Sequence, residues 1–264
     1  MDEGKITVVV TGGTSGIGRA IALLYAAEGA TVMVAGRNAA KGAATVEAID
    51  AAGGRGAFVA TNVGDQGSVV RFAQETRRRF GAPGILVNSA GLLQSGKRVL
   101  DQTMDEHDEL WRVNYRGTFL CCQAFGRMMT EAGRGAIANI GSLASLAPLS
   151  LPAYTPGKAA ILSLTQTLAA ELGPFGVRVN AVAPGYTLSD GLKEKIRAGL
   201  RDPDAIRATT ALGAFVQPDD VAHAVHFLCS ERAASITGVM LPVDAGWLVQ
   251  APYAAYMRGN PVKD

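Results

Sequence analysis

The sequence predicts an α/β protein in which helices cover both faces of one parallel sheet. Short apolar runs alternate with longer amphipathic stretches along nearly the whole chain of 264 residues. The first run, from Ile6 to Thr11, is β-branched throughout, which is typical of a strand buried on both faces. Strands and helices that alternate at this spacing are joined by right-handed crossovers and form a doubly wound sheet.

The expected elements follow one another in a regular order. In the first half, the periodicity predicts a helix over residues 16–28, a strand over 31–35, a helix over 39–52, a strand over 56–60, a helix over 66–80 and a strand over 84–88. In the second half, it predicts a long helix over 105–132, a strand over 136–140, a helix over 153–172, a strand over 177–183, a helix after Pro218 and a strand over 239–243. This is a Rossmann-like sheet of about seven strands. Because no linker or repeat divides the chain, we expect one domain over 1–250 and an irregular tail over 251–264.

The composition excludes several kinds of protein. Hydrophobic residues make up 48% of the chain and charged residues 18%, which excludes a disordered chain. The formal net charge of +2 provides no basic excess for neutralising phosphates, so we expect no nucleic-acid partner. His107, His223 and His226 are too scattered to form a metal site. Glycine is enriched, with 32 residues, and this excess needs a local explanation.

The remaining general features favour a cytoplasmic protein. Cys121, Cys122 and Cys229 include no C-x-x-C pair and are too few for a disulfide framework. The N-terminus lacks the basic and apolar regions of a signal peptide. The uncharged stretch over 135–157 contains Pro148 and Pro152, so we expect a strand and a loop there and no membrane span.

A glycine-rich turn directly follows the first expected strand. Gly12 permits a tight turn, Gly16 lets the backbone approach a pyrophosphate, and Gly18 lets the helix pack closely on the strand. The helix N-terminus then offers free N–H groups to the phosphates. A P-loop is not expected because no Gly-Lys-Ser/Thr follows, and the alternative is a glycine-rich turn without a ligand.

The end of the second expected strand indicates which cofactor binds. An acidic residue there would bond the ribose 2′-OH of NAD, whereas a nearby arginine accommodates the 2′-phosphate of NADP. This chain reads Ala35-Gly36-Arg37-Asn38, without a carboxylate. Arg37 therefore predicts NADP(H), and NAD is the alternative if Arg37 is only a solvated surface residue.

Tyr154 and Lys158 lie one turn apart on one face of the helix expected over 153–172. A nearby ammonium group favours the phenolate, which suits a tyrosine to general acid–base catalysis. Ser142 lies upstream, just after the strand over 136–140, at the carboxyl edge where such sheets bind ligands. The structural alternatives are Ser142 as a loop cap and Tyr154 as a half-buried aromatic residue.

In this order, the motifs resemble those of the classical short-chain dehydrogenase/reductase family. The similar segments are the glycine-rich turn from Thr11, Asn88-Ser89-Ala90-Gly91, Asn114 within Val113–Gly117, Ser142 with Tyr154 and Lys158, Pro184-Gly185 and Val243-Asp244-Ala245-Gly246. The resemblance implies that Tyr154 exchanges a proton with the substrate oxygen and that Ser142 binds this oxygen. It further implies that Lys158 binds the nicotinamide ribose and lowers the pKa of Tyr154, while Asn114 anchors a water near Lys158.

The same resemblance implies the cofactor and substrate sites. The residues expected at the cofactor are Gly12, Ser15, Gly16, Ile17, Gly18, Arg37, Asn62, Val63, Asn88, Ala90, Gly91, Tyr154, Lys158, Pro184, Gly185 and Thr187, although the family usually has Asp at position 62. A substrate lid is expected over residues 186–215. The candidate pocket walls carry no charge and favour a neutral or partly apolar ketone or alcohol: Leu92, Leu93, Gln94, Leu143, Ala144, Leu149, Tyr186 and Leu192. Cationic residues near the rim argue against this: Lys97, Arg98, Lys193 and Lys195.

These observations predict an NADP(H)-dependent carbonyl reductase or alcohol dehydrogenase with a small ketone or alcohol as substrate. The alternatives are an NAD-dependent polyol or sugar-alcohol dehydrogenase and a regulatory protein that only binds the cofactor. The resemblance and two helices favour a homotetramer. The helices carry apolar stripes that pack either on the sheet or on another subunit: Leu110, Val113, Gly117, Leu120, Ala124 and Met128, and Ile161, Thr165, Leu168 and Leu172.

Overall fold

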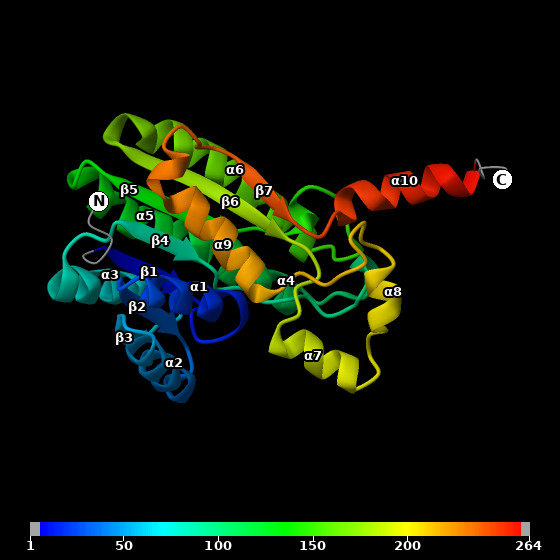
Figure 1. Ribbon diagram of the computed structural model, residues 1–264, viewed down its shortest axis with the longest axis horizontal. Coiled ribbons are helices and arrows are strands. Elements are labelled where there is room, and N and C mark those ends of the chain that lie inside the picture. Colours follow the sequence, from blue (N-terminus) through cyan, green and yellow to red (C-terminus); the bar gives the residue numbers. More distant parts are fainter. Residues whose placement is uncertain (1–5, 260–264) are drawn as a thin grey trace.

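The computed structural model describes residues 6–259 and contains one seven-stranded parallel sheet (Figure 1). The strands are β1 (Thr7–Thr11), β2 (Thr31–Gly36), β3 (Arg55–Ala60), β4 (Ile85–Asn88), β5 (Gly135–Ile140), β6 (Val177–Pro184) and β7 (Met240–Val243). Their order in the sheet is β3-β2-β1-β4-β5-β6-β7, so the direction of winding reverses between β1 and β4. In open sheets of this kind, ligands bind in the crevice at the reversal, outside the carboxyl ends of the strands.

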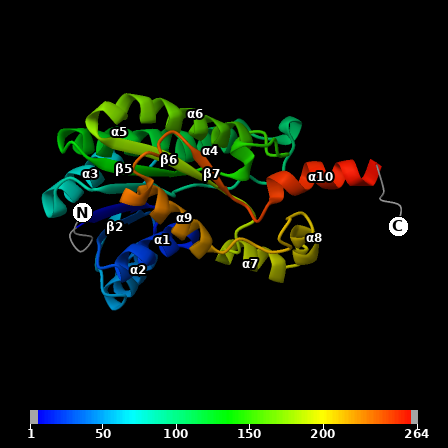
Figure 2. The ribbon, with the colours of Figure 1, turned by 45° about the horizontal axis from the view of Figure 1, so that its top comes forward.

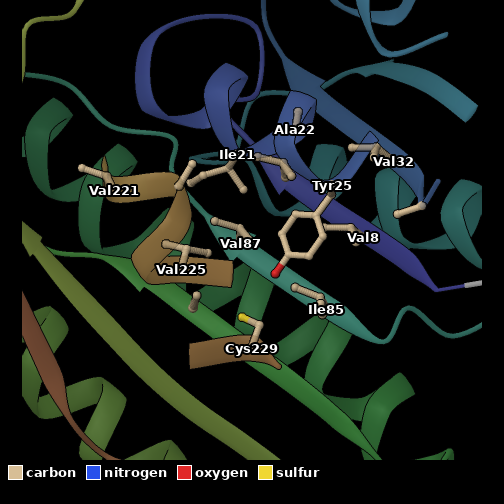
Figure 3. Packing of buried hydrophobic residues seen from close by; sticks show 14 of the residues in the cluster. Val8, Ile21, Ala22, Tyr25, Val32, Ile85, Val87, Val221, Val225 and Cys229 are labelled. Carbon is tan, nitrogen blue, oxygen red and sulfur yellow. The ribbon is translucent and has the colours of Figure 1, made fainter. Parts of the chain in front are cut away.

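Helices cover both faces of the sheet, as predicted. On one face lie α1 (Gly16–Ala27), α2 (Ala39–Ala51) and α9 (Pro218–Cys229), and on the other α3 (Gln66–Phe80), α5 (Gly117–Glu131) and α6 (Tyr154–Leu172). Successive side chains of β1 point to opposite faces of the sheet. Val8 and Val10 therefore belong to the core on the first face, and Val9 belongs to the core on the second. Figure 3 shows the first core, where the Tyr25 side chain of α1 points toward Cys229 of α9.

The long helix predicted over 105–132 is present but changes its winding. It begins as α4 (Met104–Leu110), passes through a π-helical segment at Trp111–Arg116 and continues as α5. Such π segments inside α-helices often occur at functional sites. Asn114 lies in this segment.

The apolar stripes of the two long helices mostly pack inside the subunit. The buried members are Leu110, Val113, Gly117, Leu120, Met128, Ile161 and Thr165. These stripes therefore contribute to the core under the sheet, which is the first of the two alternatives.

Two segments contain helices that the periodicity did not predict. The lid region holds α7 (Asp190–Arg197) and α8 (Pro203–Arg207). The prediction of an irregular tail is wrong for residues 251–259, because α10 (Trp247–Gly259) continues through them. This helix projects from the body of the molecule in both views (Figures 1 and 2). Residues 260–264 of the expected tail lie outside the described residues. Across residues 6–259, no helix combines the length and apolar character that a membrane span requires.

Candidate active site

A cleft of about 830 Å³ opens at the carboxyl edge of the sheet, between the glycine-rich turn and the lid region. This volume is within the range of about 300–1,000 Å³ that is usual for small-molecule sites. Most of the predicted site residues line the cleft: Gly12, Ser15, Gly16, Ile17, Gly18, Arg37, Asn62, Val63, Ala90, Gly91, Ser142, Tyr154, Lys158, Pro184, Gly185 and Thr187. Asn88 and Asn114 are buried and do not line it.

The glycine-rich turn is shaped to hold a phosphate group against its backbone. A Cβ atom at Gly12, where φ is +66°, would lie 2.7 Å from the backbone of Ala90, and one at Gly18 would lie 2.5 Å from the Gly12 carbonyl oxygen. The Ser15 side chain makes no capping hydrogen bond to α1, and the first turn of α1 holds no acidic residue. The positive end of α1 and its free N–H groups therefore face the cleft, which fits a dinucleotide pyrophosphate.

The adenosine end of the cleft lies at the carboxyl end of β2. A Cβ atom at Gly36 would lie 2.8 Å from Thr14 Cγ2, so this position has no room for a carboxylate side chain unless Thr14 moves. Arg37 follows and is exposed. The Asn62 side chain is directed to protein groups, since its Oδ1 accepts from the Gly64 N–H at 3.2 Å and from Arg112 at 3.5 Å.

Asn114 fixes the loop that follows β4. Its Oδ1 accepts from the Leu92 N–H at 2.7 Å, and its Nδ2 donates to the Leu92 carbonyl oxygen at 2.9 Å. A Cβ atom at Gly91 would lie 3.4 Å from Asn114 Oδ1 and 4.0 Å from Lys158 Nζ, so these groups share one small space. Both polar atoms of the Asn114 side chain thus serve this loop.

Asn88 lies in a buried row of polar side chains under the cleft. Its Nδ2 donates to Asn139 Oδ1 at 2.9 Å, and Asn139 Nδ2 donates to Thr165 Oγ1 at 3.0 Å. This row joins β4, β5 and α6 below the residues that line the cleft. Asn88 therefore supports the residues that line the cleft and does not itself line it, unlike the other residues predicted at the cofactor.

Ser142, Tyr154 and Lys158 line the cleft next to one another. Lys158 Nζ donates to the Ile140 carbonyl oxygen at 2.7 Å and lies 5.7 Å from the centroid of the Tyr154 ring. Ser145, which sequence reasoning missed, joins the group: its Oγ donates to the Lys158 carbonyl oxygen at 2.7 Å and accepts from the Ser142 N–H at 3.2 Å. The signal for Ser145 was its spacing from Ser142, which is that of a capping box.

Burial determines the protonation of this group. It lowers the pKa of Lys158 from 10.5 to about 8, because the ammonium loses its hydration. It also raises the pKa of Tyr154 above 10.0, although a hydrogen bond with Ser142 acts in the opposite direction. The expected lowering of the Tyr154 pKa by Lys158 is thus not seen in this structure, where loss of hydration of the phenolate is the larger effect.

The lid segment forms the remaining wall. A short bridge joins Thr187 to Val216, with the Leu188 N–H donating to the Val216 carbonyl oxygen at 2.8 Å. All the predicted wall residues line the cleft except Ala144. Asp190, Lys195 and Arg201 also line it, so the prediction of an uncharged wall is wrong on this side. Lys195 belongs to α7, and Arg201 lies in the turn between α7 and α8.

Most of the comparisons with known proteins indicate a dehydrogenase or reductase. A family profile described as enoyl-(acyl carrier protein) reductase matches residues 12–248. D-threitol dehydrogenase of Mycolicibacterium smegmatis is 39% identical over 251 residues, which cover 94% of each chain. A solved structure described as a short chain dehydrogenase/reductase family protein has a TM-score of 0.84 at 37% identity, and covers 94% of this chain and 100% of its own. Another, described as ribose-5-phosphate isomerase from Brucella melitensis, has a TM-score of 0.89 at 44% identity and covers 95% of each chain.

Proposed function

The chain belongs to the classical short-chain dehydrogenase/reductase family and is an NAD(P)-dependent oxidoreductase of alcohol or carbonyl substrates, and we propose that it uses NADP(H) with a Ser–Tyr–Lys–Asn mechanism. The observation that carries this proposal is the grouping of Ser142, Tyr154 and Lys158 in one cleft with the glycine-rich turn. A protein that only bound the cofactor would not need a buried lysine beside a half-buried tyrosine.

The proposed mechanism divides the work among the side chains. The nicotinamide, when bound, supplies the hydride to the carbonyl carbon or accepts it from the alcohol carbon. Tyr154 gives its phenolic proton to the carbonyl oxygen in reduction and takes the hydroxyl proton in oxidation. Ser142 hydrogen-bonds the same oxygen, and Lys158 holds the ribose hydroxyls. Asn114 supports this arrangement through the Leu92 loop, which lies beside Lys158.

The walls of the cleft support a neutral polyol or a cyclic alcohol as the substrate, or the matching ketone. Leucine side chains provide much of the wall, whereas Lys195 and Arg201 lie on the lid segment. The similarity to a D-threitol dehydrogenase supports a polyol in particular. An NAD-dependent polyol dehydrogenase is the second candidate, and only the cofactor separates the two.

One assay tests the proposed function. Absorbance of NADPH and NADH is followed with a panel of ketones, and that of the oxidised cofactors with polyols and cyclic alcohols. We expect turnover with at least one polyol or cyclic alcohol, and faster turnover with NADP⁺. Conversion of ribose 5-phosphate without any cofactor would instead favour an isomerase. No turnover anywhere would favour a regulatory protein.

Arg37→Asp is expected to lower the NADP/NAD ratio of kcat/KM about a hundredfold, because a charged hydrogen bond to the 2′-phosphate is lost and a repulsion appears. The ratio is measured by steady-state kinetics with both cofactors. Arg71→Asp changes the net charge equally on an exposed face of α3, outside the cleft, and should leave the ratio unchanged. An equal ratio in wild type and Arg37→Asp would contradict the assignment of Arg37.

We further propose a homotetramer, from the outer surfaces of α5 and α6. Phe119 of α5 is 41% exposed. The exposed residues of α6 are mostly small or uncharged: Pro156, Ala159, Ser163, Gln166, Thr167, Ala170 and Glu171. A helix face with so little charge is suited to close contact with another subunit. Light scattering is expected to give four times the chain mass of 27.3 kDa, and a monomeric mass would overturn the assembly.

A further inference from the structure

The helix that contains Tyr154 begins without a capping side chain of its own. Ala153 precedes α6 and cannot accept a hydrogen bond through its side chain, and Pro156 in the first turn has no N–H group. The first N–H groups of a helix have no partner within the helix and need acceptors elsewhere, above all where they are buried. Ala153 is almost fully buried, so an acceptor must come from another part of the chain.

Gln94, in the loop after β4, provides this acceptor. Its side chain is 7% exposed, and its Oε1 accepts from the N–H groups of Ala153 and Tyr154, each at 2.9 Å. Its Nε2 donates to the Lys97 carbonyl oxygen at 3.3 Å, which keeps the amide oxygen turned toward α6. All the polar atoms of this buried amide are therefore used.

The loop that carries Gln94 is fixed on both sides of it. Asn114 binds both backbone groups of Leu92, and the Ser95 N–H donates to Glu106 Oε1 of α4 at 2.9 Å. The loop thus connects α4 and the π-helical segment to the start of α6. Asn114 and Tyr154, which the proposed mechanism uses together, are held by one short piece of chain.

We propose that Gln94 is a positioning residue for Tyr154. By fixing the Tyr154 backbone N–H, Gln94 sets the direction in which the phenol enters the cleft. The role of Tyr154 itself rests on the proposed function, whereas the cap that Gln94 forms does not. Small displacements of a reacting group lower rates by large factors, so loss of this cap should be visible in turnover.

The test compares two variants that differ in the acceptor. Gln94→Ala removes it, and we expect kcat to fall about tenfold or more while KM for NADP⁺ stays within about twofold, since the glycine-rich turn is untouched. Gln94→Glu keeps an oxygen acceptor for both N–H groups and loses only the longer bond to the Lys97 carbonyl oxygen, so kcat at high pH should stay within about threefold of wild type. The negative charge of the introduced carboxylate would disfavour the Tyr154 phenolate. The pH at which kcat for alcohol oxidation reaches half its maximum should therefore rise by about half a unit in Gln94→Glu.

Amide hydrogen exchange in the cofactor-free protein provides a readout that does not depend on turnover. The amides of Ala153 and Tyr154 should exchange about tenfold faster or more in Gln94→Ala and at the wild-type rate in Gln94→Glu. If the wild type had no dehydrogenase activity, the proposed function would fail while this measurement still tested the cap.

Asp50→Ala is the matched control, because Asp50 Oδ1 accepts from the Gly56 N–H at 2.8 Å at the opposite edge of the sheet. The proposal is overturned if exchange and kcat of Gln94→Ala equal those of wild type, or if Asp50→Ala reproduces the loss of kcat. If Gln94→Ala does not fold, the pH profile of Gln94→Glu decides: a shifted midpoint supports the proposal and an unshifted one overturns it.

Discussion

Tyr154→Phe is expected to lower kcat about a thousandfold, within the range of about 10²–10⁴ that general acid–base catalysis contributes. Phenylalanine keeps the ring in its place in the cleft but cannot give a proton to the carbonyl oxygen or take one from an alcohol. KM for the cofactor should stay within about twofold, because the glycine-rich turn is unchanged. Steady-state kinetics with the best substrate of the panel measures both quantities.

Tyr25→Phe is a matched control for this loss. It also removes a buried tyrosine hydroxyl, but from the core between α1 and α9, away from the cleft (Figure 3). Its kcat should stay within about threefold of wild type, since no group near the reacting atoms changes. Equal activity of Tyr154→Phe and wild type would remove Tyr154 from the mechanism and favour a regulatory role.

The raised pKa of Tyr154 also gives the two directions of the reaction opposite pH dependence. Because the pKa of Tyr154 lies above the ordinary value of 10.0, the phenol keeps its proton at neutral pH. It can therefore act as an acid in ketone reduction. Alcohol oxidation needs the phenolate, so its rate should increase as the pH rises. This follows from burial of Tyr154 and was not accessible from the spacing of Tyr154 and Lys158.

Local patterns predicted most of the fold because the central strands are short and buried, and β1 and β2 are rich in β-branched residues. The run before the glycine-rich turn became β1 almost residue for residue, and the helix over 66–80 matches α3 at both ends. Asp65 explains the start of α3, since its side chain accepts from the Ser68 N–H at 2.6 Å. The glycine-rich turn was equally readable, because close backbone approaches leave no room for a Cβ atom at Gly12 or Gly18.

The helices and contacts that the sequence did not predict depend on partners distant in the chain, or on helix caps that hydrophobic periodicity does not indicate. Helix α10 forms although it contains Pro252, because the Asp244 side chain accepts from the N–H groups of Gly246 and Leu248, each at 2.9 Å. The contact of Gln94 with the start of α6 joins loops far apart in sequence. The pKa values at the site depend on burial, which only the assembled fold determines.

Lys158→Met is expected to remove most of the activity and yet to stabilise the protein at pH 7. Burial lowers the pKa of Lys158 from 10.5 to about 8, so below pH 8 the folded protein carries the full cost of a buried ammonium, about 3 kcal/mol. Methionine has a similar length and no charge. It loses the hydrogen bond to the Ile140 carbonyl oxygen, worth about 1 kcal/mol, so urea unfolding should show a net gain of about 2 kcal/mol.

The pH dependence of this gain separates charge from packing. From pH 8 to 10.5, the unfolded chain binds more protons at Lys158 than the folded one, so wild-type stability rises with pH through this window. At pH 10 only about 1 kcal/mol of the cost remains, which the lost hydrogen bond offsets, and the two proteins should be equally stable. Lys41→Met, at an exposed position of α2, should change stability by less than about 0.5 kcal/mol at either pH. If the gain in stability stayed constant with pH, it would come from packing alone. If the gain vanishes at pH 10, the wild type retains a destabilising charge beside Tyr154, as expected of a residue kept for catalysis.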